Sequence, residues 1–154
     1  MPSDKPGGAG RDAEISLGLL TSLLGYNLRR AQVAVFQNFT EIVGASELTP
    51  GQFGVLVVID ANPGLTQTQL GNALGIDRST VVAVIDRLES RGLVARQPSP
   101  NDRRSHALHL SGSGKATLRR LTERVRAHES EIARHLSTDE QARLIELLGR
   151  VARQ

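Results

Sequence analysis

The pattern of apolar and polar positions predicts that much of the chain is helical, because apolar residues recur every three or four positions. The longest such row, near the N-terminus, consists of Leu17, Leu20, Leu24, Leu28, Ala31, Val35, Phe39 and Ile42. A second row, on nearly the opposite side of the same helix, contains Leu19, Leu23, Tyr26 and Val33, with Arg30 and Gln37 in line. A helix of about 28 residues with two apolar sides is longer than a small domain usually needs. We expect one side to pack on its own domain and the other on a second chain; the alternative is a helix buried centrally in its own domain.

Three shorter helices are predicted in the middle of the chain from residues that start and stop helices. Thr49–Gln52 and Thr66–Gln69 have the spacing of a capping box, and Asp77 is a good N-cap for a third helix. Gly75 and Gly92 follow the second and third helices, where a left-handed residue commonly ends a helix. Because a tight turn containing glycine joins the last two helices, the segment has the pattern of a helix-turn-helix.

The spacing of apolar residues changes after this segment, where two short extended stretches are separated by a polar turn. The stretches are Leu93–Gln97 and Ser105–Leu110, and residues 98–104 between them are turn-rich and charged. A β-hairpin directly behind a helix-turn-helix is called a wing. We therefore predict a mainly α (α+β) fold, a winged helix-turn-helix with a small β-hairpin wing, flanked by long N- and C-terminal dimerisation helices.

Two further helices are predicted after the hairpin. Ser111–Gly114 opens the first, and we interpret Gly112 and Gly114 as turn-forming residues of its cap. Its apolar row consists of Leu118, Leu121, Val125, His128, Ile132 and Leu136. A capping box of Ser137 and Glu140 starts the last helix. The apolar side of that helix carries Leu144, Leu147, Leu148 and Val151.

These elements divide the chain into a winged domain over residues 48–111 and helical segments on either side. Residues 1–13 form a polar tail rich in glycine and proline, which we expect to be disordered. Residues 14–47 and 112–152 are expected to be dimerisation helices, because they supply apolar surface beyond that of the winged domain.

Composition narrows the class of protein. The chain has 154 residues, 39% of them hydrophobic, which suffices for one domain with a core. It has no cysteine, which excludes disulfide scaffolds, thiolate metal sites and thiol-based redox sensing. The longest apolar run, Val55–Ile59, is too short to span a membrane, and the N-terminus lacks the apolar segment of a signal peptide. We expect a cytoplasmic protein that does not bind membranes.

The histidines and glycines do not have the spacing of a metal or catalytic site. His106 and His109 face opposite sides of an extended segment. His128 and His135 are about 10.5 Å apart along a helix, too far to share one ion. The sequence contains no nucleophile elbow and no phosphate-binding glycine loop. We therefore predict a protein that is not an enzyme and uses no metal or cofactor, with His128 at an interface or in a pocket.

The helix that begins after Asp77 is the candidate recognition helix. Its apolar row, which we expect to be buried, consists of Val81, Val84, Ile85 and Leu88. Arg78, Ser79 and Thr80 in its first turn, and Arg87 further along, must then point away from the core. A recognition helix reads base edges in the major groove with its N-terminal residues, and these side chains reach guanine, other bases or phosphate. The alternative is an ordinary solvated turn; the wing behind the helix favours DNA binding.

The net charge of +3 is small, so the positions of the basic residues matter more than their sum. Only Lys5 and Lys115 are lysines among nineteen basic residues. The arginines of the predicted recognition helix and wing are Arg78, Arg87, Arg96, Arg103 and Arg104. Asp102 can hold a neighbouring arginine in place while Arg103 or Arg104 projects from the hairpin. A projecting guanidinium suits a narrow minor groove; the alternative is a surface ion pair.

Two motifs in this region resemble the multiple antibiotic resistance regulator (MarR) family. The first runs through Leu65–Gly71 to Asp86–Val94, which reads Asp-Arg-Leu-Glu-Ser-Arg-Gly-Leu-Val. The second is Asp102–Ser105, followed by Leu108–Ser111. The similarity extends over about residues 15–152. It implies a winged-helix transcription regulator that dimerises through its terminal helices and is often released from DNA by small aromatic acids.

The resemblance makes Arg104 the best single DNA-binding candidate in the wing. Where the family often has polar or basic residues, this chain has Val82 and Ala83, which can contact thymine methyl groups but cannot hydrogen-bond. Direct readout then depends more on the first turn of the recognition helix. The full candidate set is Thr66, Gln67, Arg78, Ser79, Thr80, Arg87, Asp102, Arg103 and Arg104.

An effector pocket is expected where the terminal helices meet the winged domain. Tyr26, Arg30 and Phe53 are the candidates for binding an aromatic acid or an aryl thioester. The favoured alternative makes Tyr26 and Arg30 dimer contacts and Phe53 part of the core.

The leading hypothesis is a homodimeric regulator of transcription, a repressor released by a small aromatic ligand. It would bind a pseudo-palindromic operator in double-stranded DNA, with half-sites about one helical turn apart. The alternative is a winged-helix module for protein–protein interaction without its own operator. Salt-dependent binding to duplex DNA separates the two hypotheses.

Overall fold

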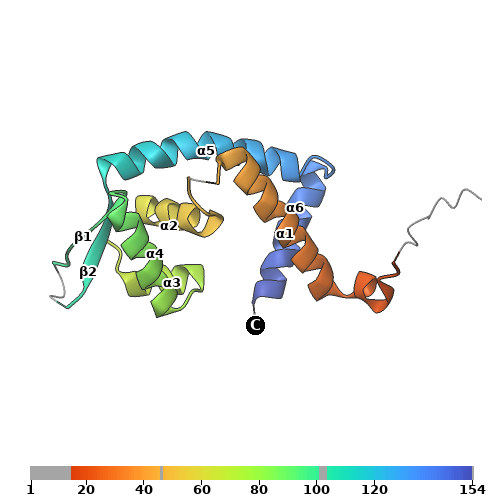
Figure 1. Cartoon of the computed structure of the whole chain (residues 1–154). Helices are drawn as coiled ribbons and strands as arrows, with labels where there is room; N and C mark the ends of the chain where they lie inside the picture. The colour runs from red at the N-terminus through yellow and green to blue at the C-terminus, as the bar shows by residue number, and fades with distance from the viewer. Residues whose placement is uncertain (1–14, 46, 101–103, 154) are drawn as a thin grey trace, which may run out of the picture. The chain divides into compact units, whose positions relative to one another are not determined.

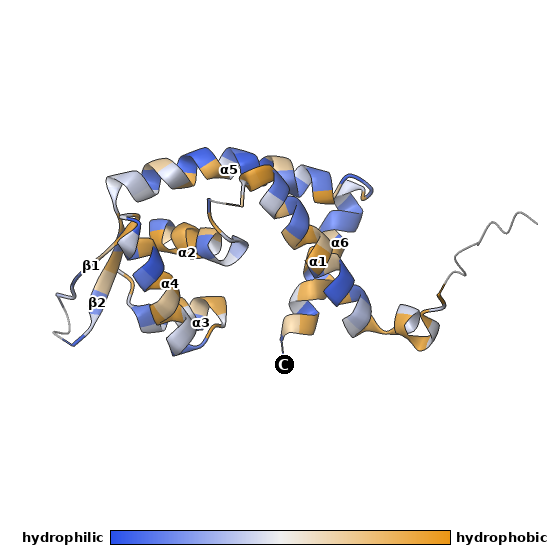
Figure 2. Cartoon of the chain, in the orientation of Figure 1, coloured by the Kyte–Doolittle hydropathy of each residue, from blue (hydrophilic) through white to orange (hydrophobic). Residues whose placement is uncertain are grey.

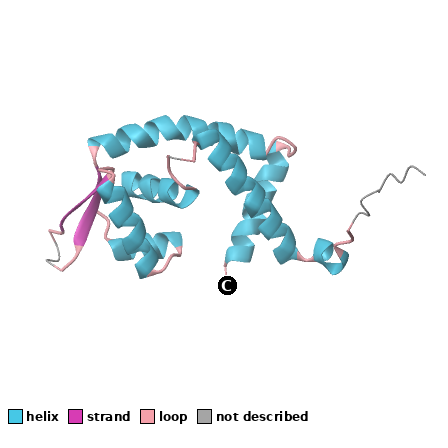
Figure 3. Cartoon of the chain, in the orientation of Figure 1, coloured by secondary structure: helices cyan, strands magenta, loops and turns pink. Residues whose placement is uncertain are grey.

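The computed structural model describes residues 15–45, 47–100 and 104–153. These residues form a 3₁₀ helix η1, six α-helices and one β-hairpin (Figure 1, Figure 3). Their bounds are Gly18–Ser22 for η1, Leu24–Val43 for α1, Pro50–Ala61 for α2, Gln67–Leu74 for α3, Arg78–Ser90 for α4, Val94–Pro98 for β1, His106–Leu110 for β2, Gly112–Ile132 for α5 and Thr138–Ala152 for α6. The chain divides into two compact units after Val33. The tail expected to be disordered lies outside the described residues.

The N-terminal helix is shorter than the sequence predicts. Leu23 separates η1 from α1 because its backbone is extended (φ −85°, ψ 126°). The side-chain amide of Asn27 donates to the carbonyl oxygens of Thr21 and Leu23, at 3.0 and 2.8 Å, and so satisfies groups next to the break. The prediction of one continuous helix is therefore wrong, and α1 has 20 residues.

The predicted capping signals are confirmed. Complete capping boxes start α2 at Thr49–Gln52, α3 at Thr66–Gln69 and α6 at Ser137–Glu140. Gly75 ends α3 in the left-handed conformation (φ 65°), and the side chain of Asp77 caps α4. These helices begin where the sequence predicts because each signal involves only residues of one turn.

The second unit has one hydrophobic core, to which α2, α3, α4, α5, the hairpin and the C-terminal end of α1 contribute. From α4, the side chains of Val81, Ile85 and Leu88 are at most 1% exposed. The fully buried residues that they join are Val43 of α1, Val55, Leu56 and Ile59 of α2, Leu70 of α3, Leu108 of β2 and Leu121 of α5. Figure 2 shows α2 as largely hydrophobic, as a central helix must be. One face of α4 is thus fixed against the core.

The hairpin is an antiparallel pair in which Val94 of β1 lies opposite Leu110 of β2. Its β2 edge is bonded to the turn before α3. The backbone N–H of Gly64 donates to the carbonyl of Leu108 at 2.8 Å, and the N–H of Leu108 donates to the carbonyl of Leu65 at 2.9 Å. Backbone hydrogen bonds and core packing therefore both hold the hairpin to the helix-turn-helix, and the predicted combination of helices with a small hairpin is confirmed.

Gly114 has a different role from the turn residue that the sequence suggests. It lies inside the first turn of α5, where its N–H donates to the hydroxyl of Ser111 at 2.9 Å. A Cβ atom at Gly114 would lie only 2.0 Å from the carbonyl oxygen of Leu93, whereas one at Gly112 would meet nothing within 4 Å. Gly114 is thus required for the close approach of α5 to the start of the hairpin.

The C-terminal part also differs from the prediction in one respect. α5 ends at Ile132, and Leu136, expected in its apolar row, lies in the following turn and is 37% exposed. The residues of α6 are not buried in the described structure, although the helix has a strongly apolar side. The terminal helices therefore keep apolar surface that the described residues do not cover.

We predict that Gly114→Ala lowers the free energy of unfolding by more than about 2 kcal/mol, because backbone must move to admit the Cβ atom. Gly112→Ala in the same turn is the matched control and should leave stability unchanged or slightly higher. Chemical denaturation of both variants measures the difference. Equal stability of the two variants would contradict the close approach of α5 to Leu93.

Candidate nucleic-acid interface

The exposed face of α4 carries the polar residues that the sequence predicts there. Arg78, Ser79, Thr80 and Arg87 are all exposed, because the buried row on the other side of α4 sets the rotation of the helix. Val82 is also exposed, at 37%, so an apolar side chain lies among the polar ones.

The first turn of α4 is organised by Asp77. Its carboxylate accepts hydrogen bonds from the hydroxyl of Ser79, the hydroxyl of Thr80 at 2.6 Å and the backbone N–H of Thr80 at 3.0 Å. The hydrogen bonds from the Ser79 and Thr80 side chains hold the pKa of Asp77 well below its usual range. Because both hydroxyl protons are donated to Asp77, these oxygens are left only with acceptor capacity for other partners.

A groove of about 190 Å³ lies between the start of α3, α4 and the hairpin. The residues that line it are Thr66, Gln67, Thr68, Arg78, Val82, Arg104, Ser105 and His106. The structure thus brings together candidates from three places: the N-cap Thr66 and first residue Gln67 of α3, Arg78 of α4 and Arg104 of the hairpin. Thr68, which is not among the sequence candidates, also lines the groove, and its only sequence signal is its position beside Thr66 and Gln67.

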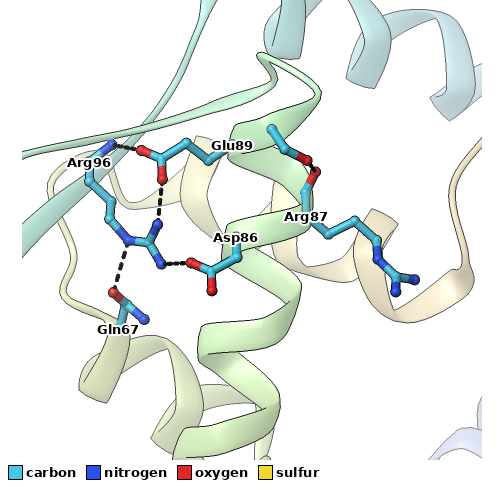
Figure 4. A network of polar contacts seen from close by, with 6 residues as sticks. Gln67, Asp86, Arg87, Glu89 and Arg96 are labelled. Atoms are coloured by element: carbon cyan, nitrogen blue, oxygen red, sulfur yellow. Dashed lines mark hydrogen bonds and ion pairs between the residues drawn. The ribbon is translucent and has the colours of Figure 1, made fainter.

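Three described candidates on α4, Ser79, Thr80 and Arg87, do not line this groove. Asp102 and Arg103 lie outside the described residues. Arg87 lies on α4, and Figure 4 shows its guanidinium pointing away from the hairpin residue Arg96. Ala83, the neighbour of Val82, is exposed on α4 as well.

Arg96 is paired within the protein, which corrects its inclusion among the arginines that favour DNA binding. Its guanidinium lies between Asp86 and Glu89 of α4, with 2.5 Å from Nη2 to the Asp86 carboxylate and a second ion pair from Nη1 to Glu89. Its Nε–H donates to the side-chain oxygen of Gln67 at 3.2 Å (Figure 4). Arg96 therefore joins β1 to α4 and α3 instead of presenting a free cation.

The effector candidates lie in different units of the chain. In the first unit, the guanidinium of Arg30 lies 5.9 Å from the centre of the Tyr26 ring, so the two side chains form a cation–π pair. In the second unit, Phe53 is partly buried and packs against the core, as the alternative interpretation of Phe53 expects.

A cavity that the sequence did not reveal lies between α2 and α5. It has a volume of about 280 Å³ and is lined by Asp60, Lys115, Leu118, Arg119 and Thr122. The only sequence signal is the spacing of Lys115 and Arg119, which places both cations on one side of a helix. Two cations and one carboxylate make this cavity suitable for an anionic group.

His128 lies in the protein interior and not in an open pocket. Its ring is 2% exposed, its Nδ1 is 2.7 Å from the side-chain oxygen of Asn38, and Phe39 meets it edge to face with 5.3 Å between ring centres. His128 thus joins α5 to the C-terminal half of α1. Within the described residues, histidine, aspartate and glutamate form no group of three that could hold a metal ion.

Comparison with known proteins shows which class of protein this chain is similar to. The chain is 41% identical over 143 residues to a putative transcriptional regulatory protein for the hcr operon of Thauera aromatica, covering 92% of this chain and 86% of that protein. It is 46% identical to the transcriptional repressor CouR in a structure bound to a 23-mer DNA duplex, with a TM-score of 0.86, covering 92% of this chain and all of the other. A structure of CouR bound to p-coumaroyl-CoA gives 43% identity and a TM-score of 0.83, covering 92% of this chain and 99% of the other.

The fold is therefore a winged helix-turn-helix, with α3 and α4 as its two helices and β1–β2 as its wing. The family model that describes the MarR family matches residues 46–105, which span the helix-turn-helix and most of the wing. The chain belongs to the MarR family of transcription regulators. In the part of the chain that the structure describes, no helix has the length and apolar character needed to cross a membrane.

We predict that Asp77→Ala lowers the melting temperature at neutral pH, because it removes the cap of α4. The pKa of Asp77 is lower in the folded protein, so its contribution is complete above the usual aspartate value and declines as pH falls below about 4. The difference between wild type and variant should thus narrow in acid. Asp139→Ala, in the first turn of α6, is the control and should cost less. A difference that widens in acid would contradict this assignment.

Proposed function

We propose that this chain is a homodimeric transcription regulator that binds double-stranded DNA, with α4 in the major groove and the hairpin beside the adjacent minor groove. The observation that carries the proposal is the groove that unites Arg78 of α4, Gln67 of α3 and Arg104 of the wing. A winged helix-turn-helix contacts DNA through these three elements in this relation. Because chromosomal DNA is the target, we expect the protein to act in the cytoplasm.

In this proposal, α4 and the wing contact different parts of the DNA. Arg78 offers a planar fork of donors for guanine or phosphate, and Ser79 and Thr80 offer acceptors for the amino groups of cytosine or adenine. Val82 contacts thymine methyl groups. Arg104 on the wing adds positive charge where the minor groove is narrow. Asp102 and Arg103 remain candidates at the same hairpin.

Dimerisation is supported by where apolar side chains are exposed. In the described residues, fifteen of the seventeen exposed large apolar side chains lie before residue 37 or after residue 135. On α6 these are Leu144, Ile145, Leu147, Leu148 and Val151. Patches of this kind usually mark protein interfaces. A two-fold axis through the terminal helices would place two copies of α4 at half-sites about 34–36 Å apart on a pseudo-palindromic operator.

We further propose that the regulator is a repressor that an aromatic acid or an aryl thioester releases from DNA. CouR, a relative with 43% identity, has been solved with p-coumaroyl-CoA, an aryl thioester whose other end is strongly anionic. Lys115 and Arg119 in the cavity between α2 and α5 supply charge complementary to an anion. Tyr26, Arg30 and Phe53 remain candidates for contacts with the aromatic part.

The proposal predicts steep salt dependence of duplex binding, because each neutralised phosphate contributes about −0.9 to the slope of log K against log salt. Arg104→Gln should weaken binding to every sequence and make the slope shallower by about 0.9. Arg126→Gln on α5, an exposed arginine paired with Glu123, is the matched control and should leave the slope unchanged. Fluorescence anisotropy with a duplex selected from a random pool measures both. Salt-independent or undetectable binding by the wild type would favour the protein-interaction alternative.

The same proposal predicts a dimer with twice the 16.6 kDa mass of the chain in solution. The double variant Leu144→Glu and Leu148→Glu should shift it to a monomer, because both side chains lie on the apolar side of α6. Val57→Glu on α2, with 42% exposure close to theirs, is the control and should stay dimeric. Sedimentation velocity at micromolar concentration measures the mass. A monomeric wild type would contradict the proposed dimer.

A further inference from the structure

The network around Arg96 contains a feature that the DNA-binding proposal does not use. The guanidinium makes contacts in three directions, to Gln67 through Nε, to Glu89 through Nη1 and to Asp86 through Nη2 (Figure 4). Glu89 also accepts the backbone N–H of Arg96, at 3.3 Å. The Arg96 side chain is only 18% exposed. These contacts hold the guanidinium in one orientation.

This orientation also determines which way the amide of Gln67 faces. A guanidinium has only hydrogen-bond donors, so the Gln67 atom that it contacts must be the carbonyl oxygen. The amide nitrogen of Gln67, with its two N–H donors, must then point away from Arg96, as Figure 4 shows. A glutamine without such a partner presents either end equally well.

Gln67 lies where the orientation of its side-chain amide can affect DNA binding. Gln67 is the first residue of α3 and lines the groove that also contains Arg78 and Arg104. The first helix of a helix-turn-helix crosses the DNA backbone, where the groups within reach are phosphate oxygens, which are acceptors. An amide that presents its N–H donors fits a phosphate, and one that presents its oxygen does not.

Resting on the proposed DNA-binding function, we propose that Arg96 is a positioning residue that aims the amide N–H donors of Gln67 at a DNA phosphate. Arg96 itself does not serve as a cation for DNA. Its charge lies between two carboxylates, Asp86 and Glu89, so the three side chains together carry a net negative charge. Arg96 therefore affects the affinity for DNA through its effect on Gln67.

A double-mutant cycle tests this coupling on the duplex selected from a random pool by the wild-type chain. Gln67→Ala should weaken binding by about three- to tenfold, the usual effect of losing one such hydrogen bond. Arg96→Lys keeps the charge, but its compact ammonium goes to the two carboxylates and leaves Gln67 unoriented. It should weaken binding about threefold alone, and by much less in a chain that already carries Gln67→Ala. Equal losses in both backgrounds would overturn the proposal.

Two further measurements separate positioning from a structural or charge role. Gln67→Glu should bind more weakly than Gln67→Ala, because Arg96 holds one carboxylate oxygen and the other faces the phosphate. Arg96→Gln should weaken binding without changing the salt slope, whereas loss of a direct phosphate contact makes the slope shallower by about 0.9. Tighter binding of Gln67→Glu than Gln67→Ala, or a shallower slope for Arg96→Gln, would overturn the proposal.

Arg126→Gln is the matched control for the cycle, because the ion pair of Arg126 with Glu123 on α5 is separate from the contacts of Arg96 and Gln67. Its effect on binding should be the same with and without Gln67→Ala. Thermal melts of all variants show whether a loss of affinity follows a loss of folding. Failure of the wild type to bind any duplex would refute the proposed function, whereas wild-type binding with additive variants would refute only the role of Arg96.

Discussion

The packing of one face of α4 against the core is the constraint on which the rest of this structure depends. Val81, Ile85 and Leu88 are inaccessible, so α4 cannot rotate without exposing them, and its other face is fixed toward solvent. The same core includes Leu108 of β2, which places the hairpin beside α4. Apolar packing thus fixes the exposed face of α4 and helps to place the hairpin beside it, and Arg78 and Arg104 line one groove as a consequence.

The charge of the interface is set by pairing more than by the number of arginines. Arg96 belongs to the wing in sequence, yet Asp86 and Glu89 neutralise it and make it a link between β1 and α4. Arg78 and Arg104 line the groove and can meet phosphate or bases there. A net charge of +3 is therefore compatible with a surface that binds a polyanion, because the sum also counts acidic residues on α1, α5 and α6.

Features that depend on residues close together in the sequence were predicted correctly, whereas contacts between residues distant in the sequence were not. The capping boxes at Thr49 and Thr66 and the left-handed Gly75 need only one turn of chain, and all were predicted correctly. Gly114 was misread because its neighbour in space, Leu93, is distant in sequence.

The helical period of α4 predicted which of its side chains are exposed, but it could not predict which arginines form ion pairs. The periodicity indicated that Arg78 and Arg87 are exposed, and they are. It gave no sign that Arg96 is paired, because two of its partners lie on α4 and the third on α3. Asp102 and Arg103 lie outside the described residues and stay predictions.

The most direct test of DNA binding by a symmetrical dimer is hydroxyl-radical footprinting on the selected duplex. A dimer with α4 in the major groove should protect two regions of the DNA that are related by two-fold symmetry and lie about one helical turn apart, with further protection of the flanking minor grooves by the wings. One unsymmetrical protected region, or none, would contradict it.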